Sequence, residues 1–300
     1  MDFHQKSYDL HTKSYEKLVT DEDDLDLYRN WFDNDTIDLW RHRRMLEVLD
    51  PFLNQFPGSA WLTVGDGCYG TSSTYISIHG GRSLPTDIDI SLLERGKREG
   101  IIDDFKYANA EDLPFDDGSF DYVYCKEAFH HFPRPYLAVY EMLRCARKAI
   151  ILTEPNDWVP SPIIRRILQL VKNWGRSLLG KKIPHPDDNN YEPIGNYVYT
   201  ISIREFQKIA LGLALPAVAY KQFHDVYEEG VEHEMPTDDS PMFKRIKRKI
   251  KANTLQKKLG LNNMNHINII IFKESPSPEL RSDLQKKGFK VVDLPKNQFI

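Results

Sequence analysis

The sequence predicts an α/β fold in which a mostly parallel sheet carries helices on both faces. Two observations support this fold: short apolar runs alternate with helical patterns from Ala60 onward, and a glycine-rich turn directly follows the first of these runs. Such alternation is typical of parallel strands that are joined by crossover helices. The composition, with 41% hydrophobic and 28% charged residues, is that of a globular chain and excludes global disorder.

Residues 1–59 precede this alternation and are predicted to form a helical cap. They are rich in charged and aromatic side chains and include an acidic cluster over 21–26. From about Thr36 to Leu53, apolar residues recur at mixed helical spacing. We therefore expect a helix that leads into the main domain.

The main domain is expected over residues 60–274, where its first five strands alternate with helices. The strands are predicted at 60–64, 83–90, 103–109, 120–125 and 148–153. Helices are predicted from about Thr71, after Ser91 and over 134–145, and Ser91 is a suitable N-cap residue. Because parallel sheets bind ligands at the carboxyl ends of their strands, we expect the functional residues just after each strand.

Two insertions and a tail complete the predicted organisation. The alternation stops after Pro155 and resumes with a helix over 202–212 and strands over 217–226 and 266–272. The predicted insertions are therefore 156–200 and 228–264. The tail, residues 275–300, contains a short helix-plus-strand pattern.

The turn after the first strand has the pattern GxGxxG, with glycines at positions 65, 67 and 70. Glycine permits a tight turn and lets a ligand approach the backbone closely. Asp89 lies 19 residues after Gly70, at the end of the second predicted strand, where a carboxylate can accept hydrogen bonds from two ribose hydroxyls. These features fit a nicotinamide dinucleotide and S-adenosylmethionine about equally well.

The segment from Ala108 to Phe132 distinguishes the two cofactors. It reads ANAEDLPFDDGSFDYVYCKEAFHHF, and through it the chain resembles class I S-adenosylmethionine-dependent methyltransferases of the type 11 group, which includes the ubiquinone and menaquinone C-methyltransferases. The matching residues are Asn109, Glu111, Asp112, Leu113, Pro114, Phe115, Ser119, Phe120, Asp121, Val123 and His131. The resemblance covers about residues 60–155. It implies a Rossmann-like sheet of seven strands with an antiparallel last strand, and S-adenosyl-L-methionine as the cofactor.

The resemblance also implies a set of cofactor-binding residues. Gly65, Gly67 and Gly70 would line the methionine part of the cofactor. Asp89, followed by Ile90, would hold the ribose.

The later strands would supply the remaining cofactor contacts. Asn109 stands where the family usually has Asp beside the adenine amino group, and its side-chain oxygen can accept the same hydrogen bond. The Ala110 amide would reach a ring nitrogen. Cys125 and Lys126, at the end of the fourth strand, would lie beside the methionyl group and the sulfonium.

The chain departs from the family pattern at two places. Thr63 replaces the usual acid of the first strand, so Asp66, inside the loop, is expected to contact the cofactor's amino group instead. The Pro-Gly-Gly turn before the fifth strand is missing. These departures leave open a non-catalytic S-adenosylmethionine-binding regulator or subunit, and a dinucleotide-dependent oxidoreductase is a weaker alternative.

Two histidines are the candidate catalytic residues. Methyl transfer to oxygen or nitrogen usually needs a base for the acceptor's proton. His131 and His130 follow the fourth strand, and an unperturbed imidazole titrates near neutrality. The alternative is a structural role at the corner between strand and helix. Glu127 and Glu154 also face the site by topology, but a solvated or capping role is an equal or better interpretation for each.

The insertion after the fifth strand contains an amphipathic pattern from Pro162 to Leu179. Nine large apolar side chains occupy one half of its helical wheel, and four cations occupy the other. We expect a mobile lid over the acceptor pocket, with peripheral contact to an anionic membrane as a secondary role. Packing on the domain or on another subunit is the alternative. A basic run over 244–251 is interpreted as a solvated face.

Charge and cysteine content limit the remaining function classes. Lys and Arg total 40 and Asp and Glu total 44, a balance that argues against general nucleic-acid binding. The apolar run Ile209–Tyr220 is too short to span a membrane. Three widely spaced cysteines fit neither a disulfide framework nor a zinc site. The sequence therefore predicts a cytoplasmic, metal-free methyltransferase that acts on a small-molecule, glycan or lipid-linked acceptor.

Overall fold

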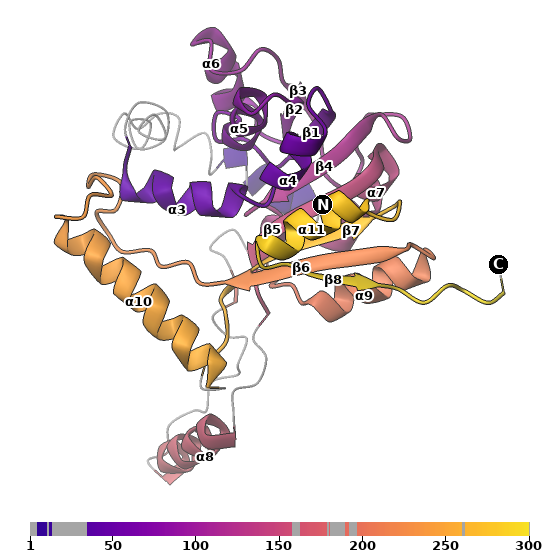
Figure 1. Cartoon of the computed structure of the whole chain (residues 1–300). Helices are drawn as coiled ribbons and strands as arrows, with labels where there is room; N and C mark the ends of the chain where they lie inside the picture. The colour runs from indigo at the N-terminus through magenta and orange to yellow at the C-terminus, as the bar shows by residue number, and fades with distance from the viewer. Residues whose placement is uncertain are drawn as a thin grey trace.

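The computed structural model describes residues 5–10, 12–13, 35–157, 163–178, 180, 190–191, 197–259 and 262–299. Its centre is one sheet of eight strands in the order β3-β2-β1-β4-β5-β7-β6-β8 (Figure 1). The strands are β1 (Ala60–Val64), β2 (Arg82–Asp87), β3 (Lys106–Tyr107), β4 (Phe120–Lys126), β5 (Ala146–Pro155), β6 (Ala217–Phe223), β7 (His266–Phe272) and β8 (Lys290–Asp293).

The predicted mostly parallel sheet is confirmed, with one strand more than expected. Strands β1 to β5 pair in parallel, and β7 runs antiparallel between β5 and β6. The eighth strand comes from the tail, because β8 pairs antiparallel with the edge strand β6. The correction from seven to eight strands has a physical reason: β8 satisfies backbone groups along an edge that would otherwise be open.

Helices cover both faces of the sheet (Figure 1). They are α3 (Ile37–Leu46), α4 (Asp50–Gln55), α5 (Thr71–Ile78), α6 (Ser91–Arg98), α7 (Pro135–Cys145), α8 (Ile163–Leu178), α9 (Ile203–Gly212), α10 (Pro241–Lys258), α11 (Pro278–Lys286) and the 3-10 helix η1 (Phe129–His131). One apolar cluster joins the sheet to α7 and α9, and a second joins its other face to α4, α5 and α11. The central strands are buried on both sides, which explains their near-continuous apolar sequence.

The predicted helix over Thr36–Leu53 is two helices, α3 and α4. Thr36 caps α3 by accepting a hydrogen bond from the Leu39 backbone N–H. A short break at 47–49 lets α4 turn onto the sheet, where Phe52 is fully buried. The cap therefore enters the core of the molecule through its second helix.

The insertion over 228–264 holds α3 in place through a third apolar cluster. Ile37 of α3 packs there with Val231, Phe243 and Ile246. A buried ion pair adds to this contact, since the Arg41 guanidinium binds the carboxylates of Asp38 and Asp225. Pairing in a buried site stabilises these charges only while every partner is present.

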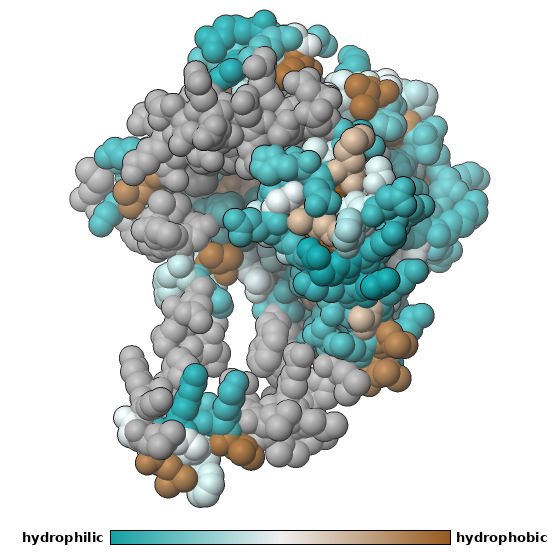
Figure 2. Space-filling model, turned by 90° about the vertical axis from the view of Figure 1, so that its left-hand side faces the viewer, coloured by the Kyte–Doolittle hydropathy of each residue, from teal (hydrophilic) through white to brown (hydrophobic). Residues whose placement is uncertain are grey.

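Helix α8 lies apart from the sheet and its covering helices (Figure 1). Its described apolar side chains Leu170, Val171, Trp174 and Leu178 are 60–69% exposed. Figure 2 shows brown, hydrophobic side chains beside teal, hydrophilic ones at the bottom of the molecule, where α8 lies. Among the described residues, no helix combines the length and apolar character needed to cross a bilayer. The division into cap, domain and tail remains a prediction.

Candidate functional site

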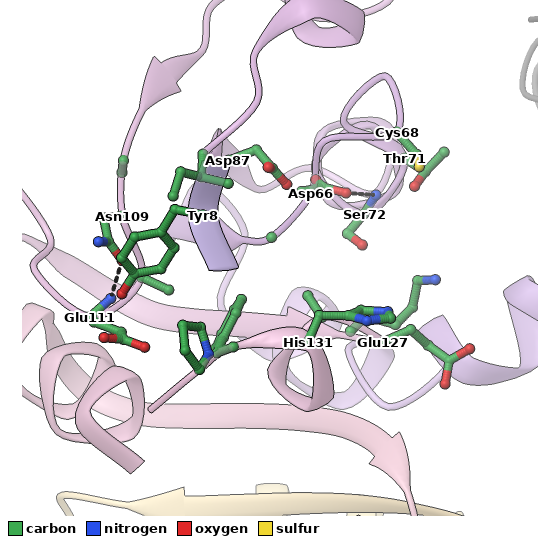
Figure 3. A pocket seen from close by; sticks show the side chains of 18 of the residues that line it. Tyr8, Asp66, Cys68, Thr71, Ser72, Asp87, Asn109, Glu111, Glu127 and His131 are labelled. Carbon is green, nitrogen blue, oxygen red and sulfur yellow. Dashed lines mark hydrogen bonds between the residues drawn. The ribbon is translucent and has the colours of Figure 1, made fainter. Parts of the chain in front are cut away.

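A pocket opens at the carboxyl edge of the parallel strands (Figure 3). Its lining comes from an N-terminal helical segment, α3, the turn after β1, and the segments that follow β2, β3 and β4. The residues are Ser7, Tyr8, His42, Gly65, Asp66, Cys68, Thr71, Ser72, Asp87, Ile88, Ala108, Asn109, Ala110, Glu111, Lys126, Glu127, Ala128, His131, Phe132 and Pro133. Of the predicted site residues, Gly65, Asp66, Asn109, Ala110, Lys126 and His131 therefore share one pocket.

The three predicted glycines form one tight turn, but only Gly65 lines the pocket. Gly65 has a φ of +70°, and a Cβ there would lie 2.2 Å from the Cβ of Ala128. At Gly67, a Cβ would lie 2.7 Å from a carboxylate oxygen of Asp87. Gly70 has a φ of +66° and packs against Ile102. The turn needs glycine for left-handed backbone and for close packing, besides any contact with a ligand.

Asp66 faces the pocket, but its carboxylate is already engaged. It accepts hydrogen bonds from the backbone N–H groups of Ser72 and Ser73, at 3.1 and 2.9 Å, and from the Thr63 hydroxyl at 2.8 Å. Burial raises the pKa of Asp66, and these donors act against the rise. The carboxylate thus holds the first turn of α5, where an acid is stabilised by the helix dipole.

The end of β2 presents Asp87 and Ile88 to the pocket, and Asp89 and Ile90 do not line it. The Asp87 carboxylate accepts hydrogen bonds from the backbone N–H groups of Gly67 and Asp89, at 2.8 and 2.9 Å. Burial raises the pKa of Asp87 to about 7. The Asp89 carboxylate accepts instead from the Ser91 backbone N–H at 2.9 Å.

The structure corrects two assignments made from the sequence, the end of β2 and the cap of α6. Strand β2 ends at Asp87, earlier than the predicted end at residue 90. Helix α6 begins at Ser91, so Ser91 is its first residue and the Asp89 side chain does the capping that was expected of Ser91. The sequence Asp-Ile-Asp-Ile repeats an acid and an apolar residue at a spacing of two, so the sequence alone left the register open.

Asn109, Glu111 and Tyr8 lie together at the end of the pocket that β3 leads into (Figure 3). Asn109 accepts a hydrogen bond from the Glu111 backbone N–H through Oδ1, at 2.9 Å. The Glu111 carboxylate is held by the backbone N–H and the guanidinium of Arg134, at 2.7 and 2.6 Å. Tyr8 of the N-terminal segment covers this end, and burial followed by the Glu111 carboxylate raises the pKa of its hydroxyl.

The end of β4 contributes Lys126 and Glu127. The Lys126 ammonium lies 3.1 Å from Nδ1 of His42 on α3. Burial, followed by the charge of Lys126, lowers the pKa of His42 well below its usual value, so this imidazole is neutral and accepts from the ammonium. Cys125 is fully buried beneath the pocket, where its thiol lies 3.7 Å from Glu154 Oε1. Burial raises the pKa of Cys125, which keeps the thiol protonated.

The two candidate histidines occupy different positions. His131 lines the pocket, whereas His130 lies behind it with Nδ1 2.7 Å from Glu154 Oε2. Glu154 is completely buried and also accepts from the backbone N–H groups of Ala128 and Phe129, both at 3.0 Å. The imidazole rings of His130 and His131 lie 4.0 Å apart. Glu154 therefore fixes the corner that presents His131.

Several lining residues were not assigned from the sequence. Asp87 and Ile88 take the place of Asp89 and Ile90 in the pocket, because β2 ends earlier than predicted. The sequence did not decide between a ligand-binding and a solvated role for Glu127, which lines the pocket. His42 carries no local motif, because it comes from the middle of a helix in the cap. In the part of the chain that the structure describes, no group of three or more His, Cys, Asp or Glu side chains is arranged to hold a metal ion.

Comparison with known proteins finds similarity over part of the chain. Residues 62–152 match the family described as "Methyltransferase domain". A demethylmenaquinone methyltransferase of Clavibacter sepedonicus is 34% identical over 102 residues, which are 32% of this chain and 41% of the relative. One of Renibacterium salmoninarum is 32% identical over 114 residues, 38% of this chain and 48% of the relative. The chain thus matches less than half the length of these curated relatives.

The chain also has some similarity to a solved structure. It is described as a SAM-dependent methyltransferase from Archaeoglobus fulgidus, is 17% identical and has a TM-score of 0.46. The alignment covers 79% of this chain and 95% of that one.

Proposed function

We propose that this chain, whose residues 62–152 match a methyltransferase-domain family, is a class I S-adenosylmethionine-dependent methyltransferase that transfers a methyl group to a small-molecule, glycan or lipid-linked acceptor. The observation that carries the proposal is the single pocket in which the glycine-rich turn, Asp87, Asn109 and His131 meet. It lies at the carboxyl edge of the sheet, where α/β folds bind their ligands.

The pocket residues fit the chemical groups of this cofactor. The Asp87 carboxylate can accept hydrogen bonds from ribose hydroxyls, and Ile88 beside it offers an apolar face to a purine. Asn109 and the Ala110 backbone can hydrogen-bond the purine edge. Lys126 is a cation suited to the cofactor's carboxylate.

The cofactor supplies an electrophilic methyl group on a sulfonium, so the protein mainly positions the reactants. His131 lines the pocket and is the proposed proton acceptor for a hydroxyl or amine acceptor. His130 does not line the pocket, so its proposed role is to position His131 through its bond to Glu154. Both assignments need an acceptor that loses a proton on methylation.

Calorimetry with S-adenosylmethionine, S-adenosylhomocysteine and NAD tests the cofactor part of the proposal. We expect micromolar binding of both sulfur nucleosides and no binding of NAD. Release of S-adenosylhomocysteine in the presence of candidate acceptors tests catalysis. Binding without release for every acceptor class would favour a non-catalytic regulator, and tight binding of NAD alone would favour an oxidoreductase.

A second part of the proposal concerns α8 and the membrane. Its exposed apolar side chains form one stripe, since positions 170, 171, 174 and 178 fall on neighbouring turns. Lys172 and Arg176 lie on the other side of the helix, an arrangement that suits anionic lipid headgroups. No described residue of α8 lines the pocket, so the expected lid is not seen in this structure.

The three cysteines are free thiols, which supports a reducing compartment such as the cytoplasm.

A further inference from the structure

One wall of the pocket is completed by residues from outside the methyltransferase segment. His42 comes from α3 and lines the pocket, and His266 is the first residue of β7. They meet the end of β4, where His42 contacts Lys126 and His266 contacts Glu127. Two imidazoles from distant parts of the chain therefore flank two neighbouring charged residues.

Glu127 is the most constrained residue of this wall. It lines the pocket, and its backbone is left-handed, with a φ of +54° that non-glycine residues seldom adopt. Its backbone N–H donates to the Thr153 carbonyl oxygen at 2.9 Å, which continues the pairing of β4 with β5. A strained backbone that the surrounding structure holds in place is found most often where a side chain has a function.

The side chain of Glu127 is fixed by His266. His266 Nε2 donates to Glu127 Oε1 at 3.0 Å, and the imidazole packs on the Phe223 ring with 5.5 Å between ring centroids. The other carboxylate oxygen, Oε2, has no hydrogen-bond partner among the described residues. One oxygen is therefore used for orientation and the other is left for a ligand.

The charges around Glu127 keep it ionised. Burial raises its pKa, but the hydrogen bond and charge of His266, with Lys126 and His130, more than offset the rise and hold the pKa well below its usual value. Arg41 also lies within electrostatic range, and the neighbouring His42 is neutral. The carboxylate is thus a fixed anion at any physiological pH, and such a group binds hydrogen-bond donors.

We propose that Glu127 binds the methyl acceptor through an O–H or N–H donor, and that His266 is the positioning residue that aims it. This inference rests on the proposed function and narrows its substrate class. The acceptor atom is a hydroxyl oxygen or an amine nitrogen: it gains the methyl group as the methyl–sulfur bond of the cofactor breaks and S-adenosylhomocysteine leaves, and its proton passes to the imidazole of His131.

Saturation-transfer NMR on the full chain saturated with S-adenosylhomocysteine tests the donor site directly. The probes are methyl α-glucopyranoside, which offers hydroxyls, ethanolamine, which offers an ammonium, and 1,4-naphthoquinone, which offers no donor. We expect signal for one donor probe in the native chain, and the probe that gives it identifies the donor class. In Glu127→Gln, which keeps an acceptor for His266, the signal should fall at least fivefold. Glu99→Gln, at the C-cap of α6 and outside the pocket, is the matched control and should match the native chain.

The inference is overturned if neither donor probe binds, if Glu127→Gln binds the probe as well as the native chain, or if only the naphthoquinone binds. Failure of S-adenosylhomocysteine itself to bind would overturn the proposed function instead.

A pH series separates positioning from a structural role of His266. In His266→Gln, burial should raise the pKa of Glu127, so probe binding should weaken from pH 8 to pH 5 at constant melting temperature. The native chain should show no such loss from Glu127, and an unaltered pH profile in the variant would contradict the positioning role.

Discussion

At the scale of single residues, two aspartates two positions apart have different tasks. Asp87 faces the pocket and is buried against the glycine-rich turn, whereas Asp89 holds the first turn of α6. The sequence could not separate them, because each precedes an isoleucine near a strand end. The residue at which β2 ends determines which aspartate faces the pocket, and that end is set by the pairing of β2 with β1 and β3.

Exchanging each aspartate for asparagine should separate these tasks. Asp87→Asn should weaken binding of S-adenosylhomocysteine by about 2 kcal/mol, roughly 30-fold, since it removes a charged hydrogen-bond acceptor. Asp89→Asn should leave affinity within about twofold and lower the free energy of unfolding by less than about 1 kcal/mol, because asparagine also caps helices well. Calorimetry and chemical denaturation measure the two effects. Equal losses of affinity in both variants would show that the ribose assignment is wrong.

Asp87 should also make cofactor binding depend on pH. Its pKa in the free protein is about 7, and ribose hydroxyls bind the ionised form. Affinity for S-adenosylhomocysteine should therefore fall as the pH drops below about 7, approaching tenfold per pH unit. Calorimetry between pH 5.5 and 8.5 checks this, and the Asp87→Asn variant should lack that dependence.

The raised pKa of Asp87 has the opposite effect on the stability of the folded protein. The pKa of Asp87 is raised above its unfolded value, so its contribution to stability is fully present below about pH 4 and is lost as the pH rises through about 7. Cofactor binding compensates at higher pH, because a ligand that binds only the folded state stabilises it. A melting series with and without S-adenosylhomocysteine should thus show the largest ligand-induced shift above pH 7.

At the scale of elements, α3 depends on a buried charge cluster. Arg41 is the shared partner of Asp38 and Asp225, and its side chain is only 8% exposed. Arg41→Ala should lower the free energy of unfolding by about 3–5 kcal/mol, because it leaves two buried carboxylates without a cation. Arg43→Ala, in an exposed pair with Asp35, should cost less than about 1 kcal/mol. Chemical denaturation compares the two, and similar losses would contradict the assigned role of the buried cluster.

Helix α8 supports a prediction about membranes. Replacing Leu170 and Trp174 by serine should reduce co-sedimentation with anionic phosphatidylglycerol vesicles by at least tenfold, since each exposed large apolar side chain contributes about 1.5–3 kcal/mol when buried. Leu213→Ser, at a 43% exposed position next to α9, is the control. Binding should weaken at high salt if Lys172 and Arg176 contribute. Equal sedimentation of all three proteins would leave α8 without a lipid role.

At the scale of the whole molecule, the sequence predicts strands and site residues that lie within one continuous segment. It misses contacts between residues that are far apart in the chain. Strands β1, β4 and β5 could be placed because each is a short apolar run followed by turn residues, whereas β2 and β3 end earlier than predicted. Gly65, Asn109, Lys126 and His131 could be assigned to a site because each follows a strand within one segment. His42 and His266 could not, because only tertiary folding brings a cap helix and the seventh strand to the end of β4.

The tail shows the same limit. Its helix-plus-strand pattern was visible, but its place in the sheet depends on partners far away in the sequence. Leu280, Leu284 and Phe289 pack in the same apolar cluster as Phe52 of α4 and the inner face of β7. This packing predicts that residues 275–300 unfold together with the main domain.

Truncating Leu284 tests that prediction. The side chain is completely buried, so Leu284→Ala should lower the free energy of unfolding of the whole chain by about 2–5 kcal/mol, in a single transition. Leu255→Ala, at a 59% exposed position on α10, should change it by less than about 0.5 kcal/mol. Circular dichroism and tryptophan fluorescence should report the same midpoint in each variant. A tail that were a separate appendage would lose its own structure in Leu284→Ala and leave the main transition where it was. Affinity for S-adenosylhomocysteine should be unaltered under native conditions, because the tail packs on the sheet face and no residue from 275 to 299 lines the pocket.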